Sequence, residues 1–472
     1  MSAAARACLA AAGVLLGGCA VGPNYERPAT NPPAAFRGSA GGSAASDLAW
    51  WDVYRDPALS SLVRSALANG YDARIAASRV LESRAIASEV HGQLFPGVGY
   101  AGNADRGRNA VLGNAFPGGT ASAQDGFDAY LGAAWEFDLW GRVRRLDEAA
   151  RAQYLATQDA SRGVRLSLES DVATAYYELL ELDDELAIEK SATESFGESL
   201  RLFNLQLQGG TASRLDSASA EAAMESSRAR IPALEMQIEE KENQISVLIG
   251  ANPGPIARGA TLPGEPAPPD IPAGIPSGLL ERRPDVRQAE EAARAANAGI
   301  GVTIGGFLPR IGLSAVLGGV STQLDQITTH GSQLWSVGAN VTGPLFQGGS
   351  LHGQYDAAKE RWEEAKLQYQ QAALSAFGDV ANALVARQKL AEARASQERA
   401  VKAYEEAVTL STERYKAGRA SYYEVIQSQL LLFPAQVTLA QTRRDQFLAV
   451  VQLYQALGGG WTAEGGAPAG KP

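Results

Sequence analysis

The chain of 472 residues repeats part of its sequence at long range. A Gly-Thr-Ala-Ser run at 210–213 returns as Gly-Arg-Ala-Ser at 418–421, and a Val-Leu-Ile-Gly run at 247–250 returns as Gln-Ala-Leu-Gly at 455–458. Both pairs are 208 residues apart (418 minus 210, 455 minus 247). Solenoid repeats have periods of about 20–50 residues, so this spacing indicates a tandem duplication of a whole structural half.

Each half contains a long segment without proline, at 143–208 and at 351–417. Apolar residues recur in both segments at alternating steps of three and four, which is the spacing of the seam in a left-handed coiled coil. A helix of about 66 residues would span about 100 Å. Glycine follows each segment, and Ser213 and Ser421 are placed to cap a returning helix. The pattern predicts one antiparallel helical hairpin in each half.

Alternating apolar and polar residues precede each long segment. The clearest run is 127–139, and 335–345 repeats it; their partner runs are 98–106, which is the weaker, and 311–318. A period of two predicts strands with one apolar and one polar face, which is typical of a transmembrane β-barrel. One face of a soluble sandwich is the alternative, but the chain supplies no second sheet. Four strands cannot close a barrel, and lipid excludes open edges, so a dimer or a trimer must complete the sheet.

The composition excludes several classes of function. The net charge of −10 argues against nucleic acid as a partner, because phosphate binding needs a basic surface. Cys8 and Cys19 are the two cysteines and the three histidines are scattered, so we expect neither a disulfide framework nor a metal site. The run at 97–102 matches a dinucleotide fingerprint, but no βαβ unit surrounds it. We therefore interpret it as a chance match and expect no cofactor and no enzyme.

The N-terminus has the features of an export signal. Arg6 precedes an apolar run, and residues 1–18 fit a secretory signal peptide. The following Cys19 ends a Leu-Gly-Gly-Cys run that resembles a bacterial lipobox, in which the thiol takes a covalent lipid such as palmitate and anchors the chain. Ala20 favours the outer membrane by the same resemblance. A signal peptide with a chance cysteine is the alternative. Residues 20–48, rich in Pro, Gly, Ala and Ser, predict an extended tether.

Three motifs resemble the outer-membrane factor family, the TolC/OprM-like exit ducts, and within it the NodT branch of lipoproteins. They are Cys-Ala-Val-Gly-Pro-Asn-Tyr at 19–25, Glu-Arg-Arg-Pro-Asp-Val-Arg at 281–287 and Leu-Tyr-Gln-Ala-Leu-Gly-Gly-Gly-Trp at 453–461. The resemblance implies an internally duplicated α+β membrane protein. Each chain would contribute four strands to a trimeric 12-stranded transmembrane β-barrel, which continues as a long coiled-coil α-helical barrel.

The resemblance also implies a function. The chain would be the outer-membrane exit duct of a tripartite efflux pump, passively conducting substrates to the exterior. Its partners would be two further copies, a periplasmic adaptor (membrane fusion) protein, an inner-membrane transporter of the resistance-nodulation-division type, and outer-membrane lipid. It would be lipid-anchored in the bacterial outer membrane and extend into the periplasm. A structural trimeric coiled-coil stalk without transport is the alternative.

Site residues follow from the resemblance as well. The family's hairpin tips contact the adaptor, and its tip pattern Arg-Tyr-x-x-Gly occurs at 414–418, whereas Gln206 and Leu207 replace Arg and Tyr in the first half. Residues just past the tip constrict the duct, and Gln427 stands where the family often has a carboxylate, so its ring would be neutral. The implied tip residues are Gly210, Ser213, Arg414, Tyr415, Gly418 and Ser421. The implied periplasmic gate residues are Tyr423, Gln427, Glu424, Asp216 and Arg214.

These segments set the predicted boundaries. A signal peptide at 1–18 and a tether at 19–56 precede the first repeat, 57–250, with strands near 98–106 and 126–139, a long helix 143–208 and a return helix 211–249. A Pro/Gly-rich linker at 251–278 precedes the second repeat, 279–458, with strands near 310–318 and 335–346, a long helix 350–417 and a return helix 420–457. Residues 459–472 form a C-terminal tail.

Overall fold

The computed structural model describes residues 20–36, 54, 56–108, 110–111, 114–115, 123–265 and 276–459. The predicted signal peptide, Cys19 and nearly all of the C-terminal tail lie outside these residues. The chain divides into two compact units. The sheet unit comprises Met1–Ala29, Arg79–Gln158 and Gln288–Gln370. The hairpin unit comprises Thr30–Ser78, Asp159–Arg287 and Gln371–Pro472.

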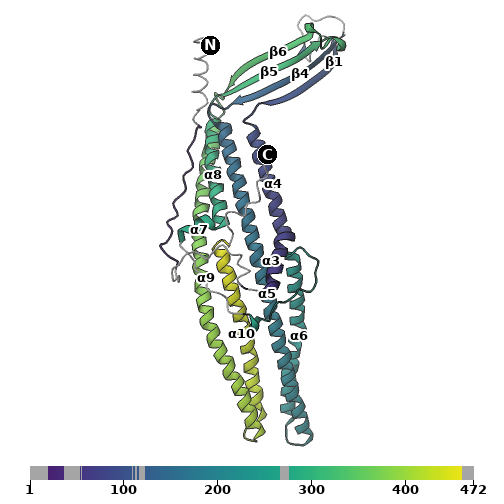
Figure 1. The fold of residues 1–472 in the computed structure, drawn as a ribbon, viewed down its shortest axis with the longest axis vertical. Coiled ribbons are helices and arrows are strands. Elements are labelled where there is room, and N and C mark those ends of the chain that lie inside the picture. The colour runs from purple at the N-terminus through teal and green to yellow at the C-terminus, as the bar shows by residue number, and fades with distance from the viewer. Residues whose placement is uncertain are drawn as a thin grey trace. The chain divides into compact units, whose positions relative to one another are not determined.

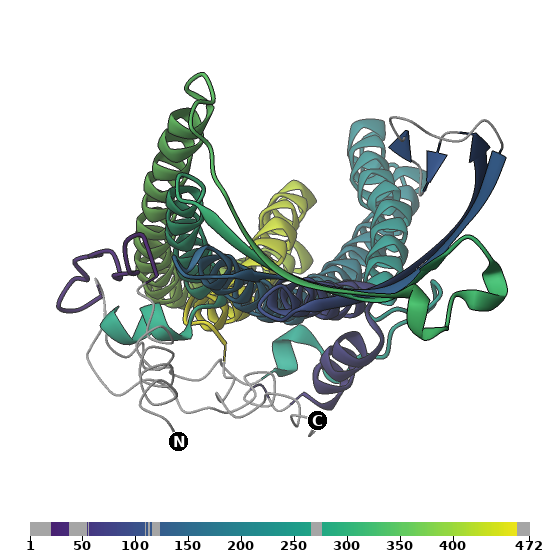
Figure 2. The ribbon, with the colours of Figure 1, turned by 90° about the horizontal axis from the view of Figure 1, so that it is seen from above.

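The sheet unit contains a four-stranded antiparallel sheet in the order β1-β4-β5-β6 (Figure 1). Figure 2 shows these strands as one curved sheet. The short strands β2 and β3 pair with each other. The strands are β1 (Gly97–Arg108), β2 (Ala110–Val111), β3 (Asn114–Ala115), β4 (Ala123–Phe137), β5 (Arg310–Ser321) and β6 (Gln333–Thr342).

Two strands end earlier than the sequence pattern predicts. β4 ends at Phe137, because the carboxylate of Asp138 turns the chain by accepting hydrogen bonds from the backbone N–H groups of Val143 and Arg144, at 3.0 and 2.9 Å. These groups belong to the unpaired N–H groups of the next helix, so Asp138 caps it. β6 ends at Thr342, two residues before Pro344, which has no N–H group for a ladder.

The strand register aligns apolar side chains across the sheet. Tyr100 pairs with Leu131, which pairs with Leu317, which pairs with Trp335. Side chains in directly paired positions share one face of a sheet. This face is open to solvent within the chain: Tyr100 is 89% exposed and Trp335 is 73% exposed. An apolar sheet face of this kind requires an apolar environment that the chain itself does not supply.

The long helices show the duplication directly. α5 (Arg142–Gln208) and α9 (Ser350–Lys416) each have 67 residues, and α6 (Arg214–Leu248) and α10 (Tyr422–Ala456) each have 35. The second member of each pair begins 208 residues after the first (350 minus 142, 422 minus 214). The remaining helices are α3 (Pro57–Asn69), α4 (Tyr71–Gly92), α7 (Pro276–Arg282) and α8 (Pro284–Gly305), with 3-10 turns at Leu262–Gly264, Leu324–Gln326 and His330–Ser332.

No described helix combines the length and the apolar character needed to cross a membrane.

The core of the hairpin unit forms where α5 meets α10. The Tyr177 ring stacks on Phe447 with centroids 4.6 Å apart, and the Tyr54 hydroxyl donates to the Phe447 carbonyl oxygen at 3.0 Å. Tyr177 and Phe447 are almost completely buried. Stacked aromatic pairs contribute about 0.5–1.5 kcal/mol beyond the area that they bury. These contacts join the two repeats in the hairpin unit, because α5 belongs to the first repeat and α10 to the second.

Candidate functional site at the hairpin tips

The tip between α5 and α6 is closed by a capping box. Gly210 has φ of +72°, which glycine adopts without steric cost. Ser213 caps α6: its hydroxyl accepts from the Asp216 backbone N–H at 3.2 Å, while the Asp216 carboxylate accepts from the Ser213 backbone N–H at 3.0 Å. The same carboxylate also accepts from the Ser213 hydroxyl at 2.7 Å. The structure therefore places Asp216, an expected gate residue, in a local capping role.

The tip between α9 and α10 is built differently. Gly418 has φ of +66°, but the Ser421 side chain makes no capping hydrogen bond to α10. Arg414 at the end of α9 lies 3.7 Å from the Glu424 carboxylate in the first turn of α10. The ion pair joins the two helices across the turn. Both side chains are more than two-fifths exposed, so the pair contributes little stability, about 0–1 kcal/mol.

Tyr422 joins the two hairpins, and the sequence pattern did not single it out. Its hydroxyl is hydrogen-bonded to the Ser199 hydroxyl at 2.8 Å, and Ser199 is buried. Its ring packs edge-on against Phe203 at 4.8 Å and against Tyr415 at 4.7 Å. The Tyr415 hydroxyl in turn accepts a hydrogen bond from the Gln206 amide. Tyr422 thus binds α10 to both α5 and α9.

An apolar cluster lies next to Tyr422. Phe203 of α5, Ala220 of α6 and Ile426 of α10 are buried together, with Leu200, Ala212 and Tyr422 packed against them. Tyr422 and Ile426 are four residues apart, so they share a helix face. That spacing is the one sequence signal that could have separated Tyr422 from the adjacent Tyr423.

A second face of α10, about 100° around the helix from Tyr422 and Ile426, is exposed and carries two expected gate residues. Tyr423 is 62% exposed, and Gln427, four residues later, is also exposed. Leu430 and Leu431 extend this exposed surface. Tyr423 and Gln427 therefore share one face, whereas Asp216 and Glu424 make local polar contacts and Arg214 lies exposed on the other hairpin. The gating role of all five residues stays a prediction.

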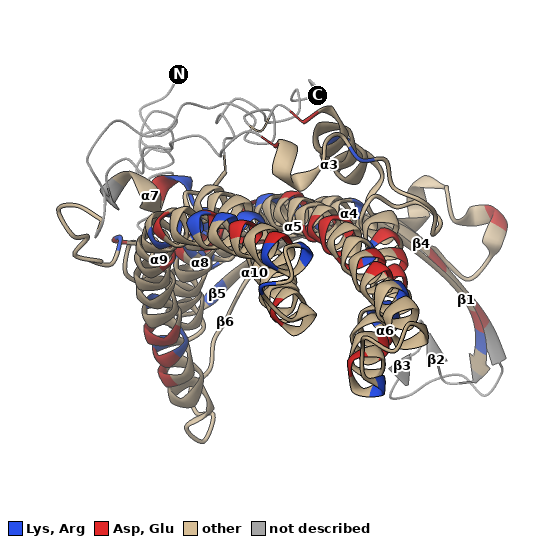
Figure 3. Ribbon diagram, turned by 90° about the horizontal axis from the view of Figure 1, so that it is seen from below, with Lys and Arg blue, Asp and Glu red and all other residues tan. Residues whose placement is uncertain are grey.

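The two tips differ in the number of charged residues that they carry. The α9–α10 tip has exposed Arg414, Lys416 and Arg419, with Glu413 and Glu424 as its acidic groups, whereas the α5–α6 tip has Arg214 and Asp216. Farther along the helices, both signs of charge are mixed on α5, α6, α9 and α10 (Figure 3). Mixed charges of both signs favour a hydrated surface on these helices.

Two carboxyl groups in the hairpin unit have strongly raised pKa values. Burial raises the pKa of Glu181 on α5 to about 7, although Arg444 of α10, 3.2 Å away, opposes the shift. Burial, with the charge and hydrogen bond of Asp56, raises the pKa of Glu265 to about 7. Asp56 caps α3 through the Ala58 N–H at 2.7 Å. Neither group lies among the tip residues.

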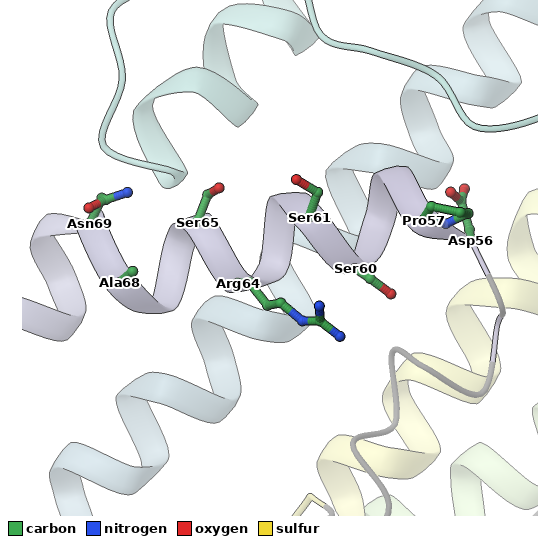
Figure 4. A pocket seen from close by; sticks show the side chains of 8 residues that line it. All are labelled: Asp56, Pro57, Ser60, Ser61, Arg64, Ser65, Ala68 and Asn69. Atoms are coloured by element: carbon green, nitrogen blue, oxygen red, sulfur yellow. The ribbon is translucent and has the colours of Figure 1, made fainter.

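A shallow pocket runs along α3 beside Asp56 (Figure 4). Its polar lining is spread along the helix and includes a single cation, Arg64, among the residues that line it. Within the described ranges, no group of three or more His, Cys, Asp or Glu side chains is arranged to hold a metal ion. The residues that line the pocket are Asp56, Pro57, Ser60, Ser61, Arg64, Ser65, Ala68 and Asn69.

Comparisons with known proteins agree with this architecture. The solvent efflux pump outer membrane protein SrpC of Pseudomonas putida is 34% identical over 459 residues, covering 95% of this chain and 97% of SrpC. The cation efflux system protein CusC of Escherichia coli is 30% identical over 452 residues, covering 94% of this chain and 96% of CusC. The solved outer-membrane channel OprN superimposes with a TM-score of 0.87 at 29% identity, covering 94% of this chain and 100% of OprN.

The family model described as outer membrane efflux protein matches residues 62–251 and 275–459. The matched ranges include both long hairpins and all four strands of the main sheet. The family prediction made from the three motifs is therefore confirmed, and the chain belongs to the outer membrane efflux protein family.

Proposed function

We propose that this chain is the outer-membrane exit duct of a tripartite efflux pump and that three copies form the duct. The observation that carries the proposal is the sheet. It has an exposed apolar face, and among the described strands β1 and β6 each pair on one side only. Backbone N–H and C=O groups in lipid must be paired, so an open sheet does not persist there. Further copies of the chain would supply the missing neighbours.

Three copies fit the chain better than one or two. Four strands are too few to close a barrel, since about eight is the smallest number that does. Three copies would supply 12 strands, and the resemblance to TolC/OprM-like ducts favours this number over two. Each chain also contributes two hairpins of matched length, so three copies would give six similar hairpins around one axis. A round helical tunnel needs hairpins that are nearly equivalent in this way.

The duct would open and close at the hairpin tips. Tyr423 and Gln427 would line its narrow periplasmic end, with Glu424, Asp216 and Arg214 nearby. Opening would move α10 relative to α5, and the contacts of Tyr422 oppose that movement. Adaptor binding at the tips would shift the population toward the open state by favouring it energetically. Passive conduction requires no catalytic group, cofactor or energy source in the chain.

The partners and the anchor follow from the same function. A periplasmic adaptor would bind the tip residues, and an inner-membrane transporter of the resistance-nodulation-division type would deliver substrate. The chain would reside in the bacterial outer membrane, with a covalent lipid on Cys19. SrpC and CusC have similar identity to this chain but are named for solvent and for cation efflux, so membership of the family does not assign the cargo.

Reconstitution into planar bilayers tests the proposal. The purified chain should insert as a trimer and give discrete single-channel current steps of uniform size. A trimer that binds membranes without conducting ions would support the stalk alternative instead. A heat-unfolded sample serves as the control, because it retains any conducting contaminant of low molecular mass but loses the duct.

A further inference from the structure

Helix α10 has a proline in its interior, at Pro434. Proline has no backbone N–H group, so the carbonyl oxygen of Leu430, four residues earlier, loses its helical hydrogen bond. The Thr438 hydroxyl donates to the Pro434 carbonyl oxygen at 2.8 Å, and hydroxyls that bond back to the preceding turn also tend to bend helices. Helix kinks occur at positions of this kind. Pro434 is therefore the point at which α10 bends most easily.

Three contacts bind α10 to α5 on the tip side of this proline, within residues 422–433, which we call the tip segment. Two are hydrogen bonds of 2.8 Å between neutral side chains, and the third is an edge-on pair of phenylalanine rings with centroids 5.6 Å apart. The three pairs are Tyr422 with Ser199, Gln429 with Ser195, and Phe433 with Phe196. Hydrogen bonds of this kind are weak in net terms, because water replaces them when the helices separate. Together with the apolar cluster around Ile426, these contacts define the position of the tip segment against α5.

The contact between α10 and α5 on the other side of Pro434 is of a different kind. Arg444 pairs with the buried Glu181 at 3.2 Å, and the almost completely buried Phe447 stacks on Tyr177. A buried carboxylate is costly to leave without its cationic partner, and closely packed buried rings lose their contacts when they separate. This part of α10 is therefore bound to α5 more firmly than the tip segment.

Gln429 makes the binding of the tip segment incomplete. Its side chain is buried, yet its oxygen Oε1 has no hydrogen-bond partner in the described part of the chain. An amide side chain has a donating NH2 group and an accepting oxygen, and the Ser195 hydroxyl serves the NH2 group. A buried polar atom without a partner is unfavourable, and water would supply the partner on exposure. Gln429 thus favours release of the tip segment.

Along the same stretch, α10 contacts α9 through apolar side chains. Leu432 and Leu439, which flank Pro434, are buried together with Val401 of α9. Figure 1 shows α9 and α10 side by side down to their shared tip. Apolar contacts have no preferred direction, unlike hydrogen bonds. The α9 surface therefore accommodates a small rotation of the tip segment.

The first repeat is built differently at the equivalent height. The position in α6 that corresponds to Pro434 is Ser226 (434 minus 208), and the proline inside α6 is Pro232. Near this height α6 is held to α5 by the buried carboxylate of Glu189, which pairs with Arg230 at 2.9 Å. The second hairpin therefore combines a bend and a weakly held tip at one level, and the duplication alone does not account for this.

We propose that opening bends α10 at Pro434: the tip segment swings away from α5, while residues 435–456 stay bound. Gln429 sets the balance between the two positions, because its unpaired oxygen gains water as a partner only when the tip segment moves. The inference rests on the proposed function, since it takes α10 as the helix that moves at the periplasmic end. Opening would then leave the Arg444 ion pair and the stacked Phe447 ring in place.

The tip segment is long enough to move the expected gate residues. Residues 422–433 span about 18 Å at the helical rise, so a bend of about 20° displaces the end of the segment by about 6 Å. Tyr423 and Gln427 lie in its first two turns and would move with it. A bend at Pro434 would therefore widen a ring of three such segments.

Distances between spin labels on either side of Pro434 test the inference. In a Cys8→Ser, Cys19→Ser background, one nitroxide per chain is placed at Arg419→Cys, in the α9–α10 turn, or at Thr438→Cys, both of which are exposed positions. The distances between copies are measured by double electron–electron resonance with and without Tyr422→Ala, which favours opening. Distances at 419 should widen by at least about 5 Å, whereas those at 438 should change by less than about 2 Å.

Single-channel recording gives a second readout. Pro434→Ala restores the N–H group and stiffens α10, so opening must also separate the contacts beyond the proline, and the open probability should fall at least about tenfold. Pro232→Ala is the matched control, because it makes the same change inside α6 and should leave the open probability within about twofold of the unmodified chain. Each variant is first shown to assemble as a trimer.

Two variants with opposite effects test the role of Gln429. Ser195→Ala alone leaves both ends of the buried amide without a partner, so it should raise the open probability at least about fivefold. Ser195→Ala with Gln429→Leu removes the amide as well. The open probability should then return to that of the unmodified chain or fall below it, because the bound tip segment no longer contains an unpaired polar atom.

Two results would overturn the inference. Equal widening at 419 and 438 would show that α10 moves as one helix. An unchanged open probability in Pro434→Ala would show that opening needs no bend at this position. Trimers that conduct in none of the variants, the unmodified chain included, would refute the proposed function instead, since the bend concerns only how a conducting duct opens.

Discussion

Tyr422 offers the sharpest test of the proposed gate, because its contacts would oppose the movement of α10 relative to α5. Tyr422→Phe removes only the hydroxyl that bonds to Ser199, and one hydrogen bond contributes about 1 kcal/mol. Tyr422→Ala also removes the edge-on contacts with Phe203 and Tyr415, each worth about 0.5–1.5 kcal/mol. If these contacts break when α10 moves, the opening equilibrium should shift by about fivefold for Phe and, for the sum of about 2–4 kcal/mol, by about 30–900-fold for Ala.

The assay is the open probability of single channels in planar bilayers at fixed voltage. Tyr71→Phe is the matched control, because it removes an exposed hydroxyl on α4, outside the proposed gate and tip residues, and should leave the open probability within about twofold of the unmodified chain. The reasoning is refuted if both Tyr422 variants assemble as trimers and yet open as rarely as the unmodified chain. Tyr422→Ala must also raise the open probability more than Tyr422→Phe does.

Three further predictions concern the gate, pH and the tip. Tyr423→Ala with Gln427→Ala should raise single-channel conductance, and unchanged conductance would remove both residues from the gate. The pKa of Glu181 is raised to about 7 in the folded chain. Its protonation therefore stabilises the folded chain fully below about pH 4.5, and this contribution is lost as pH rises through about 7. Over this pH range the free energy of unfolding of Glu181→Gln should fall by up to about 3 kcal/mol less than that of the unmodified chain. Thermal unfolding at several pH values measures it, and the same pH dependence in both proteins would contradict the prediction. Gly418→Ala should destabilise the tip by about 1–2 kcal/mol, visible as a lower Tm, since φ of +66° is strained for alanine; an equal Tm would show that the turn relaxes.

The long helices were predictable because two features of the sequence, the length without proline and the period of the apolar residues, each indicate a helix. Proline is absent from the whole of α5 and α9, and the apolar seam recurs over many turns. Strand ends were harder to place. The alternation in β4 continues past Phe137 in the sequence, but Asp138 caps α5 and ends the strand. A local capping hydrogen bond overrides a periodic pattern that carries no information about its own end.

The tip contacts could not be predicted from one repeat at a time. The sequence comparison showed that Gln206 and Leu207 of the first repeat differ from Arg414 and Tyr415 of the second. The structure shows that two of these mismatched residues meet, since Gln206 donates to Tyr415. The residues that differ between the repeats therefore complement each other, because the first repeat supplies the donor and the second supplies the acceptor. Periodicity identifies which residues share a helix face, whereas such a pair depends on how the two hairpins pack.

Asp216 and Glu424 show the same limit of prediction from the sequence. They occupy equivalent positions in the two repeats, 208 residues apart (424 minus 216), and both were expected near the gate. The shorter Asp216 side chain closes a capping box with Ser213, whereas the longer Glu424 reaches Arg414 across the turn. The first repeat has Gln206 at the position equivalent to Arg414, so Asp216 has no equivalent cation across its turn. The sequence carries that difference, but the position of the facing residue decides its effect.

The number of chains in one closed ring tests the central claim most directly. In a Cys19→Ser, Cys8→Ser background, cysteine pairs with one member on β1 and one on β6 are oxidised in vesicles and separated under denaturing conditions. We predict that at least one register gives a covalent trimer as the largest product, because β1 of each copy pairs with β6 of the next until three copies close. Products that stop at dimers or continue beyond three chains, or the absence of any cross-link across the scanned registers, would contradict the account.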